Sequence, residues 1–102
     1  MAYNKHWKPV TEENINKVLN WLNTANIGIS KEVLGKWFKI YNMRISGTEY
    51  LDIANNQKHS IQTVRNYYFR AKKCVECLRN NNIAEIIQWA KWWGHYRITA
   101  DR

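Results

Sequence analysis

Apolar residues recur at steps of three and four along most of this chain, which is the period of an α-helix and not of a β-strand. Helix breakers are rare, with four glycines and one proline among 102 residues. A hydrophobic content of 45% is sufficient for one folded core at this length. We therefore expect an all-α protein, a compact bundle of about five helices that forms a single domain over residues 1–102.

Capping residues place the helix ends. Thr11 precedes two acidic residues that suit a first helical turn, and Ser30 can cap a second helix. Ser46 and Glu49 match a capping box, which predicts the start of a third helix after a basic connector. Gly94 is a natural C-terminal cap for the last helix. The expected elements are an extended basic arm over residues 1–10, helices over 12–24, 30–41, about 48–56, 60–79 and 83–93, and the connector at 42–47.

The segment YLDIANNQKHSIQTVRNYYFR, residues 50–70, combines two short helical patterns at a tight connection. Ala54 is small enough for the two helices to cross closely, and Ser60 can cap the second one. Val64 and Tyr67 then point back at the first helix. The outward residues are Ile61, Gln62, Arg65, Asn66 and either Phe69 or Arg70, and this is how a helix is presented to the major groove of DNA.

The spacing I-A-x5-S-x2-T-V-R-N-Y resembles the tetrahelical helix-turn-helix of sigma-factor region 4 and LuxR-type regulators. Residues 70–79 resemble the basic continuation of the recognition helix in the sigma-type members. The resemblance covers residues 48–79 and departs from the family at Lys58, where the turn usually carries a glycine. It implies a sequence-specific, double-stranded DNA-binding transcriptional regulator of prokaryotic or phage type.

The charge favours a polyanionic partner, with nucleic acid ahead of an anionic membrane surface. The net charge is +8 and the isoelectric point is near 9.7. Between residues 58 and 79 lie six Lys or Arg residues against one acid, Glu76. The excess of positive charge is therefore concentrated on the proposed recognition segment.

The side chains of the recognition segment predict two kinds of DNA contact. Arg65 can bond both acceptors of a guanine edge, Gln62 or Asn66 can pair with adenine, and Ile61 can touch a thymine methyl. The alternative for these residues is an ordinary solvated helix face. Six further residues are expected at phosphates, which would give a salt slope near −5 at about 0.9 per phosphate. These are Lys58, Thr63, Tyr68, Arg70, Lys72 and Lys73.

The last helix carries more large apolar side chains than a small domain buries easily, and such a patch often marks an interface. It predicts a homodimer or docking to another protein, with simple burial as the alternative. A membrane-surface helix has little support, because the cationic face is weak. The expected interface residues are Ile86, Trp89, Trp92, Trp93 and Tyr96.

Cys74 and Cys77 form a C-x-x-C pair, but no second ligand pair follows at the spacing of a zinc site. Since they continue the apolar stripe of their helix, we expect core thiols, no metal and no cofactor. No catalytic constellation is present, which argues against an enzyme. No signal peptide opens the chain and no apolar run reaches the length of a membrane span, so we expect a cytoplasmic protein.

Two alternative functions stay open. The first is a protein-interaction module that engages RNA polymerase or another regulator through a sigma-like fold. The second is a replication-associated protein that binds single-stranded nucleic acid, with Trp and Tyr stacking on unpaired bases. Residues 26–39 also echo the segment thirty residues later, with Ser30, Leu34 and Trp37 in corresponding places. The echo indicates either a second, degenerate helix-turn-helix for DNA or self-association, or an ordinary amphipathic helix of similar length.

Overall fold

The computed structural model describes residues 9–93, apart from the side chains of residues 92 and 93. Most of the expected basic arm and the expected cap at Gly94 lie outside the described residues. The predicted all-α fold is confirmed, because the described residues form five α-helices and no strand. The helices are α1 (Glu12–Thr24), α2 (Lys31–Ile45), α3 (Tyr50–Gln57), α4 (Ile61–Asn80) and α5 (Ile83–Trp93).

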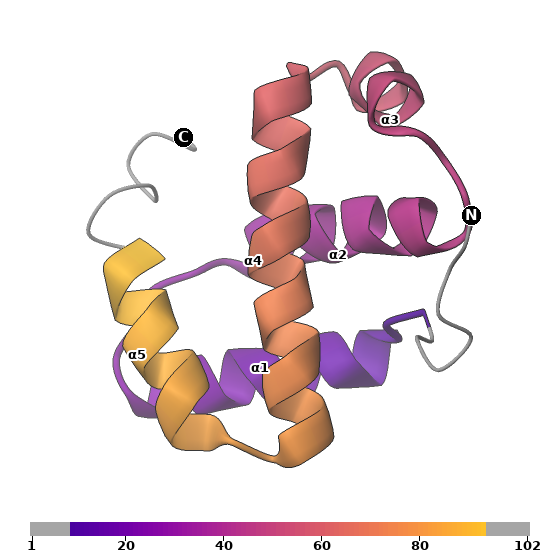
Figure 1. Cartoon of the computed structure of the whole chain (residues 1–102). Helices are drawn as coiled ribbons and strands as arrows, with labels where there is room; N and C mark the ends of the chain where they lie inside the picture. The colour runs from indigo at the N-terminus through magenta and orange to yellow at the C-terminus, as the bar shows by residue number, and fades with distance from the viewer. Residues whose placement is uncertain (1–8, 94–102) are drawn as a thin grey trace.

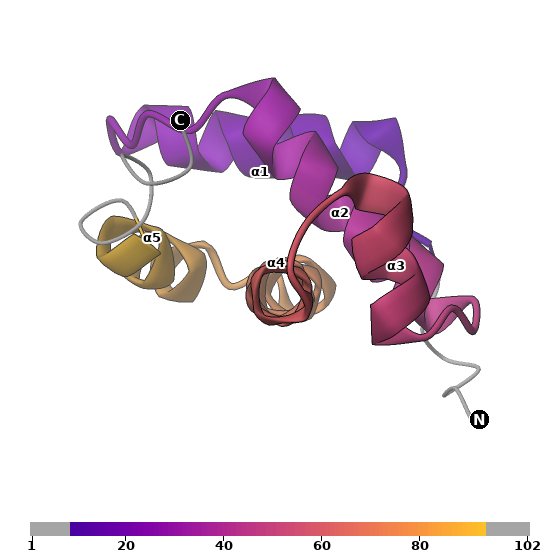
Figure 2. The ribbon, with the colours of Figure 1, turned by 90° about the horizontal axis from the view of Figure 1, so that it is seen from above.

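Helix α4 is the central rod of the fold (Figure 1). It packs mainly against α2, with α3 beside its first turns and α5 folded back beside its last turns. Viewed along its axis in Figure 2, α4 has α5 on one side, α1 above it in the picture, and α2 and α3 on the other side. Among the described residues, no helix covers the remaining side, and this is where α4 presents its polar face.

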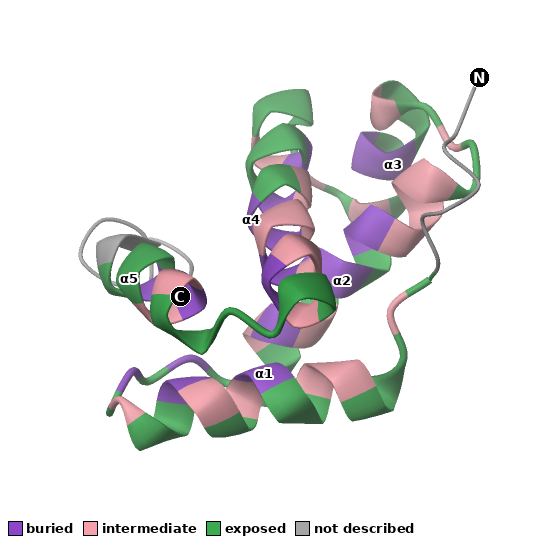
Figure 3. Cartoon of the chain, turned by 60° about the horizontal axis from the view of Figure 1, so that its bottom comes forward, coloured by how far each residue is buried: buried purple, intermediate pink, exposed green. Residues whose placement is uncertain are grey.

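The core forms where α1, α2 and α4 meet, with α3 and α5 closing its two ends. Its largest fully buried side chains are Trp37, Tyr41 and Phe38 of α2, and Val64, Cys74 and Cys77 of α4 face them. Figure 3 shows the result as a buried inner side and an exposed outer side on most helices. The three- and four-residue spacing of the apolar side chains is what places them on one side.

The expected caps at the starts of α1 and α2 both form. Thr11 Oγ1 accepts a hydrogen bond from the backbone N–H of Asn14 at 3.3 Å, and Asn14 Oδ1 accepts one from the backbone N–H of Thr11 at 3.2 Å. Ser30 Oγ accepts from the backbone N–H of Val33 at 3.1 Å. Each bond satisfies an N–H that a helix start would otherwise leave unpaired.

The prediction for residues 42–47 is wrong. Helix α2 continues to Ile45, because Met43 and Ile45 pack against the core and extend its apolar side. Asn42 is not a connector residue either. Its side-chain amide bonds the backbone N–H and C=O of Val10 at 2.7 and 3.1 Å, which fixes the chain that leads into α1.

The predicted capping box at Ser46 is also wrong. Ser46 Oγ donates to the backbone oxygen of Met43 at 2.8 Å, so the side chain bonds the end of α2 and does not start α3. Helix α3 begins at Tyr50, two residues later than expected, and its N-cap Glu49 makes no side-chain capping bond. Ser46 and Glu49 have capping propensity and the right spacing, but they do not mark the start of α3.

The connection from α3 to α4 takes three residues, 58–60, and Lys58 occupies the position of the usual glycine. Its backbone lies in the left-handed region, with φ 60° and ψ 45°, which glycine adopts without strain. The N–H groups of Lys58 and His59 both donate to the backbone oxygen of Ala54. Ser60 then caps α4 by accepting from the N–H of Thr63 at 3.1 Å. The turn thus has the conformation that a glycine would adopt, although the residue is lysine.

Candidate nucleic-acid interface

The first half of α4, residues 61–69, has a packed inner face and a polar outer face. Val64 and Tyr67 are buried, while Gln62, Arg65 and Asn66 are exposed (Figure 3). Gln62 Nε2 donates to Asn66 Oδ1 at 3.1 Å, which joins the two amides one turn apart on the helix surface. Ile61 lies at the start of this face and is 37% exposed. All four residues expected at bases are therefore accessible.

Arg65 does not extend freely into solvent. Its guanidinium carbon lies 5.4 Å from the ring centroid of Tyr50, the first residue of α3. Arg44, near the end of α2, places its guanidinium carbon 4.6 Å from the same centroid. A cation over an aromatic face is attracted by the ring quadrupole, so three helices contribute to one cluster at this end of the molecule.

The residues expected at phosphates lie in different environments. Lys58 is exposed at the turn. Thr63 Oγ1 accepts from Ser60 Oγ at 2.9 Å and keeps its own hydroxyl hydrogen as a donor. Tyr68 stacks on Tyr41 with ring centroids 5.6 Å apart, and so packs against the core more than it faces outward.

The prediction that Arg70 contacts a phosphate from the outer face of α4 is wrong. Its side chain is only 7% exposed. The guanidinium carbon lies 5.0 Å from the ring centroid of Trp37 and 5.7 Å from that of Tyr67. Because Arg70 follows Tyr67 by three residues and precedes Cys74 by four, it falls on the packed side of α4. It holds α4 to α2, and its burial removes it from the candidate interface.

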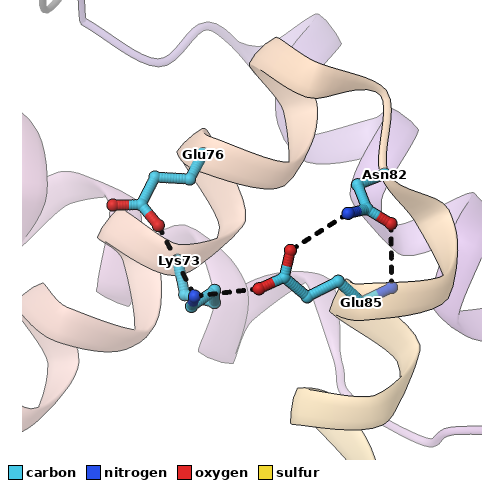
Figure 4. Close-up of polar contacts among 4 residues, drawn as sticks. All are labelled: Lys73, Glu76, Asn82 and Glu85. Carbon is cyan, nitrogen blue, oxygen red and sulfur yellow. Dashed lines mark hydrogen bonds and ion pairs between the residues drawn. The ribbon is translucent and has the colours of Figure 1, made fainter.

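Lys73 is engaged within the protein, as Figure 4 shows. Its Nζ lies 3.1 Å from Glu85 Oε2 and 3.5 Å from Glu76 Oε1, and 5.0 Å from the Trp89 ring centroid. The hydrogen bond to Glu85 is the main reason that the pKa of Lys73 is raised. Asn82 orients Glu85 through a side-chain bond at 3.1 Å and accepts its backbone N–H at 3.2 Å. Lys73 therefore links α4 to α5, whereas Lys72 is half-buried beside it.

The expected interface on α5 is partly corrected. Ile86 is fully buried and belongs to the core, because it faces α4 and α1 together with Ala90. Trp89 is 40% exposed and lines an open groove with Asn82, Ala84, Glu85 and Gln88. The side chains of Trp92 and Trp93, and the whole of Tyr96, lie outside the described residues.

Cys74 and Cys77 are buried free thiols in the core, as expected. Burial raises the pKa of the Cys77 thiol to about 11, and that of Cys74 moves further in the same direction. Raised pKa values keep both groups protonated and unreactive at neutral pH.

Sequence reasoning missed Arg44, Tyr50 and Leu51 at this end of the molecule. Arg44 was assigned to a connector, although it is one helical turn beyond the buried residues Ile40 and Tyr41. Leu51 of α3 and Phe69 of α4 are both 57% exposed, and Phe69 meets the ring of Tyr68 edge-on with ring centroids 5.5 Å apart. The sequence shows only the cationic and aromatic character of Arg44 and Tyr50 on either side of the connection from α2 to α3, and their contact depends on how the helices pack.

The echo at residues 26–39 does not reproduce the same turn. The connection from α1 to α2 spans residues 25–30, twice the length of residues 58–60. It buries Ile27 and Ile29 in the core, whereas the shorter turn buries no apolar side chain. Ser30 and Ser60 are equivalent as caps, but a second helix-turn-helix stays a prediction.

Comparison with known proteins finds no matching family model, no similar curated protein and no similar solved structure. The resemblance to sigma-type and LuxR-type regulators therefore rests on the sequence pattern of residues 48–79 alone. Over the described residues, no helix has the length and apolar character to cross a membrane.

Proposed function

We propose that this protein binds double-stranded DNA in a sequence-specific manner and acts as a transcriptional regulator of prokaryotic or phage type. The first half of α4 would enter the major groove, and α3 would cross the phosphate backbone beside it. The observation that carries the proposal is the exposure of Gln62, Arg65 and Asn66 on the side of α4 opposite its packed face. These side chains supply the donors and acceptors that base edges recognise.

The positions of the cations support DNA binding as well, but with fewer phosphate contacts than the sequence predicted. Lys58 is an exposed cation for a phosphate contact, the half-buried Lys72 is proposed for a second one, and Thr63 adds a hydroxyl donor at the start of the helix. Arg70 is excluded by burial, and the charge of Lys73 is compensated by two carboxylates. At about 0.9 per phosphate, the two lysines of residues 58–79 contribute a salt slope of about −2, instead of the value near −5 expected from six phosphates.

Selection of bound sequences from a random duplex library tests the proposal. We expect a recovered motif, and we expect Arg65→Ala to lose about 1–3 kcal/mol of discrimination at one base pair of it. Lys72→Ala is the matched control from the same helix, because it should weaken the recovered and scrambled duplexes alike. A library that yields no motif would contradict sequence-specific binding.

Self-association through α5 is part of the proposal, with Trp89 as its accessible aromatic residue. Two copies joined in this way would bind a palindromic site with half-sites about 34 Å apart. Truncation at Asn82 is a poor test, since it also removes Ile86 and Ala90 from the core. Trp89→Gln leaves those residues in place and should shift the sedimentation mass to that of a monomer; an unchanged mass would refute the role of Trp89.

A second candidate is a protein-interaction module that engages RNA polymerase or another regulator. It is favoured by Leu51 and Phe69, two exposed apolar residues where a DNA-binding surface is usually polar. A gel shift with random duplex at low salt separates the two, because the module would leave the duplex unshifted. Single-strand stacking has less support, since Trp37 and Tyr67 are buried and Tyr68 is stacked.

A further inference from the structure

Two arginines from different helices share one aromatic ring beside the exposed face of α4. Arg44 of α2 and Arg65 of α4 place their guanidinium carbons 4.6 and 5.4 Å from the ring centroid of Tyr50. Arg44 Nη1 also donates to the backbone oxygen of Thr48 at 3.4 Å, at the edge of hydrogen-bonding distance. The result is a pair of cations gathered on one platform at the start of α3.

The platform is anchored to the core through stacked rings. Tyr50 meets Tyr68 edge-on, with ring centroids 6.0 Å apart, and Tyr68 stacks on Tyr41 at 5.6 Å. Tyr41 is fully buried in α2. The packed interior therefore fixes the position of Tyr50. Its ring in turn restrains the side chains of the arginines that it contacts.

Arg65 keeps its charge available for a ligand. Over the part of the chain that the structure describes, no carboxylate forms an ion pair with it, and its guanidinium group lies over the ring of Tyr50. A ring restrains a guanidinium group without occupying its N–H donors, which lie in the plane of the group. Restraint before binding lowers the entropy that a flexible side chain loses on binding.

We propose that Tyr50 is a positioning residue that holds Arg65 for its contact with a base edge, and that Arg44 contacts a neighbouring phosphate. This inference rests on the proposed function, because it assigns roles within the same DNA interface. It adds Arg44 of α2 and Tyr50 of α3 to a surface that the sequence pattern placed almost entirely on α4. Arg44 then contributes affinity for any duplex, and Arg65 contributes discrimination between sequences.

The test compares affinities for the selected duplex and a scrambled duplex over a range of salt concentrations, by fluorescence anisotropy. Tyr50→Leu should lower the ratio of the two affinities about two- to fivefold, the range expected for an exposed cation–π contact. Tyr50→Phe keeps the ring and should preserve the ratio. Arg44→Ala should weaken both duplexes alike and reduce the salt slope by about 0.9.

A double-mutant cycle separates positioning from a general structural effect. If Tyr50 acts through Arg65, then Tyr50→Leu should leave the affinity ratio unchanged in an Arg65→Ala background. A urea melt of each variant checks folding. Should Tyr50→Leu lose its cooperative transition, Tyr50→Met replaces it, since an unbranched apolar side chain fills the site with less strain.

The outcomes distinguish this inference from the proposed function. A wild-type protein with equal affinity for both duplexes would overturn both. A selective wild type with an equally selective Tyr50→Leu variant would overturn the role of Tyr50 alone. If Tyr50→Leu lowers the affinity ratio equally in the wild-type and Arg65→Ala backgrounds, the role of Tyr50 is also overturned. Tyr50 would then act on DNA binding without Arg65.

Discussion

Both halves of α4 carry net positive charge, the second more than the first, and they use it differently. In residues 61–69, Arg65 lies on the outer face above the ring of Tyr50 and its donors remain available. In residues 70–80, Arg70 is buried between Trp37 and Tyr67, and Lys73 is bonded to Glu76 and Glu85. One helix thus presents a polar surface at one end and holds the bundle together at the other.

The difference follows from what each half packs against. The first half packs against α3 and α2, where Tyr67 meets Trp37 and Tyr68 stacks on Tyr41, and no described helix covers its outer face. The second half lies between α2 and α5, so that its cations find rings and carboxylates nearby. A run of basic residues on one helix therefore does not define one function, and stability and binding should respond to different substitutions.

The largest expected effect is on stability, at Arg70. Arg70→Ala removes a buried side chain and its contacts with two aromatic rings, and should lower the free energy of unfolding by about 2–4 kcal/mol. Arg70→Met keeps most of the volume without the charge and should cost less, about 1 kcal/mol. Urea unfolding measures both. Surface substitutions usually change the free energy of unfolding by less than about 0.5 kcal/mol. A loss of that size for Arg70→Ala would contradict the assignment of the second half of α4 to holding the bundle together.

A smaller effect is expected from alkaline pH, through the thiols of the second half. The pKa of Cys77 is raised by burial from 9.0 to about 11, so the buried neutral thiol contributes fully below pH 9. That contribution should be lost as the pH rises from about 9 to about 11, at up to about 1.4 kcal/mol per pH unit. Cys77→Ala serves as the control, because Lys73 and Tyr41 titrate in both proteins. Parallel stability curves for the two proteins in this window would contradict the assignment.

The smallest expected effect is on the salt dependence of DNA binding, which separates an exposed lysine from one that is paired within the protein. Lys58→Gly should reduce the salt slope by about 0.9, whereas Lys73→Ala should change it little because its charge is already compensated. Lys58→Gly should also relieve the left-handed backbone at position 58, with a gain of up to about 1 kcal/mol in stability. Affinity titrations at several salt concentrations measure the slopes. Equal slope changes for the two variants would show that both lysines reach phosphates.

The fold was largely predictable from local signals. The ends of α1, α4 and α5 agree with the sequence analysis because Thr11, Ser60 and the asparagines at 80–82 act within a few residues. The end of α2 and the start of α3 were not predictable. There, the packing of Ile45 outweighs the capping propensity of Ser46, and burial is not visible in a short sequence window.

The candidate site was predictable only along α4. The helical period separates Gln62, Arg65 and Asn66 from Val64 and Tyr67, so their exposure followed from spacing. The burial of Arg70 depends on Trp37, thirty-three positions earlier, and the cluster at Tyr50 depends on Arg44 of another helix. Contacts of this kind arise only when the helices pack, which is why sequence spacing alone does not give them.

The most direct test of the central claim is to map the DNA contact on the protein by NMR. Backbone amide shifts are followed while a duplex carrying the selected motif is added. We expect the largest changes at residues 61–69, with smaller ones at Arg44 and Lys58. Changes confined to α1 or α5, or none at a duplex concentration that saturates binding, would contradict the assignment of the first half of α4 as the DNA-reading surface.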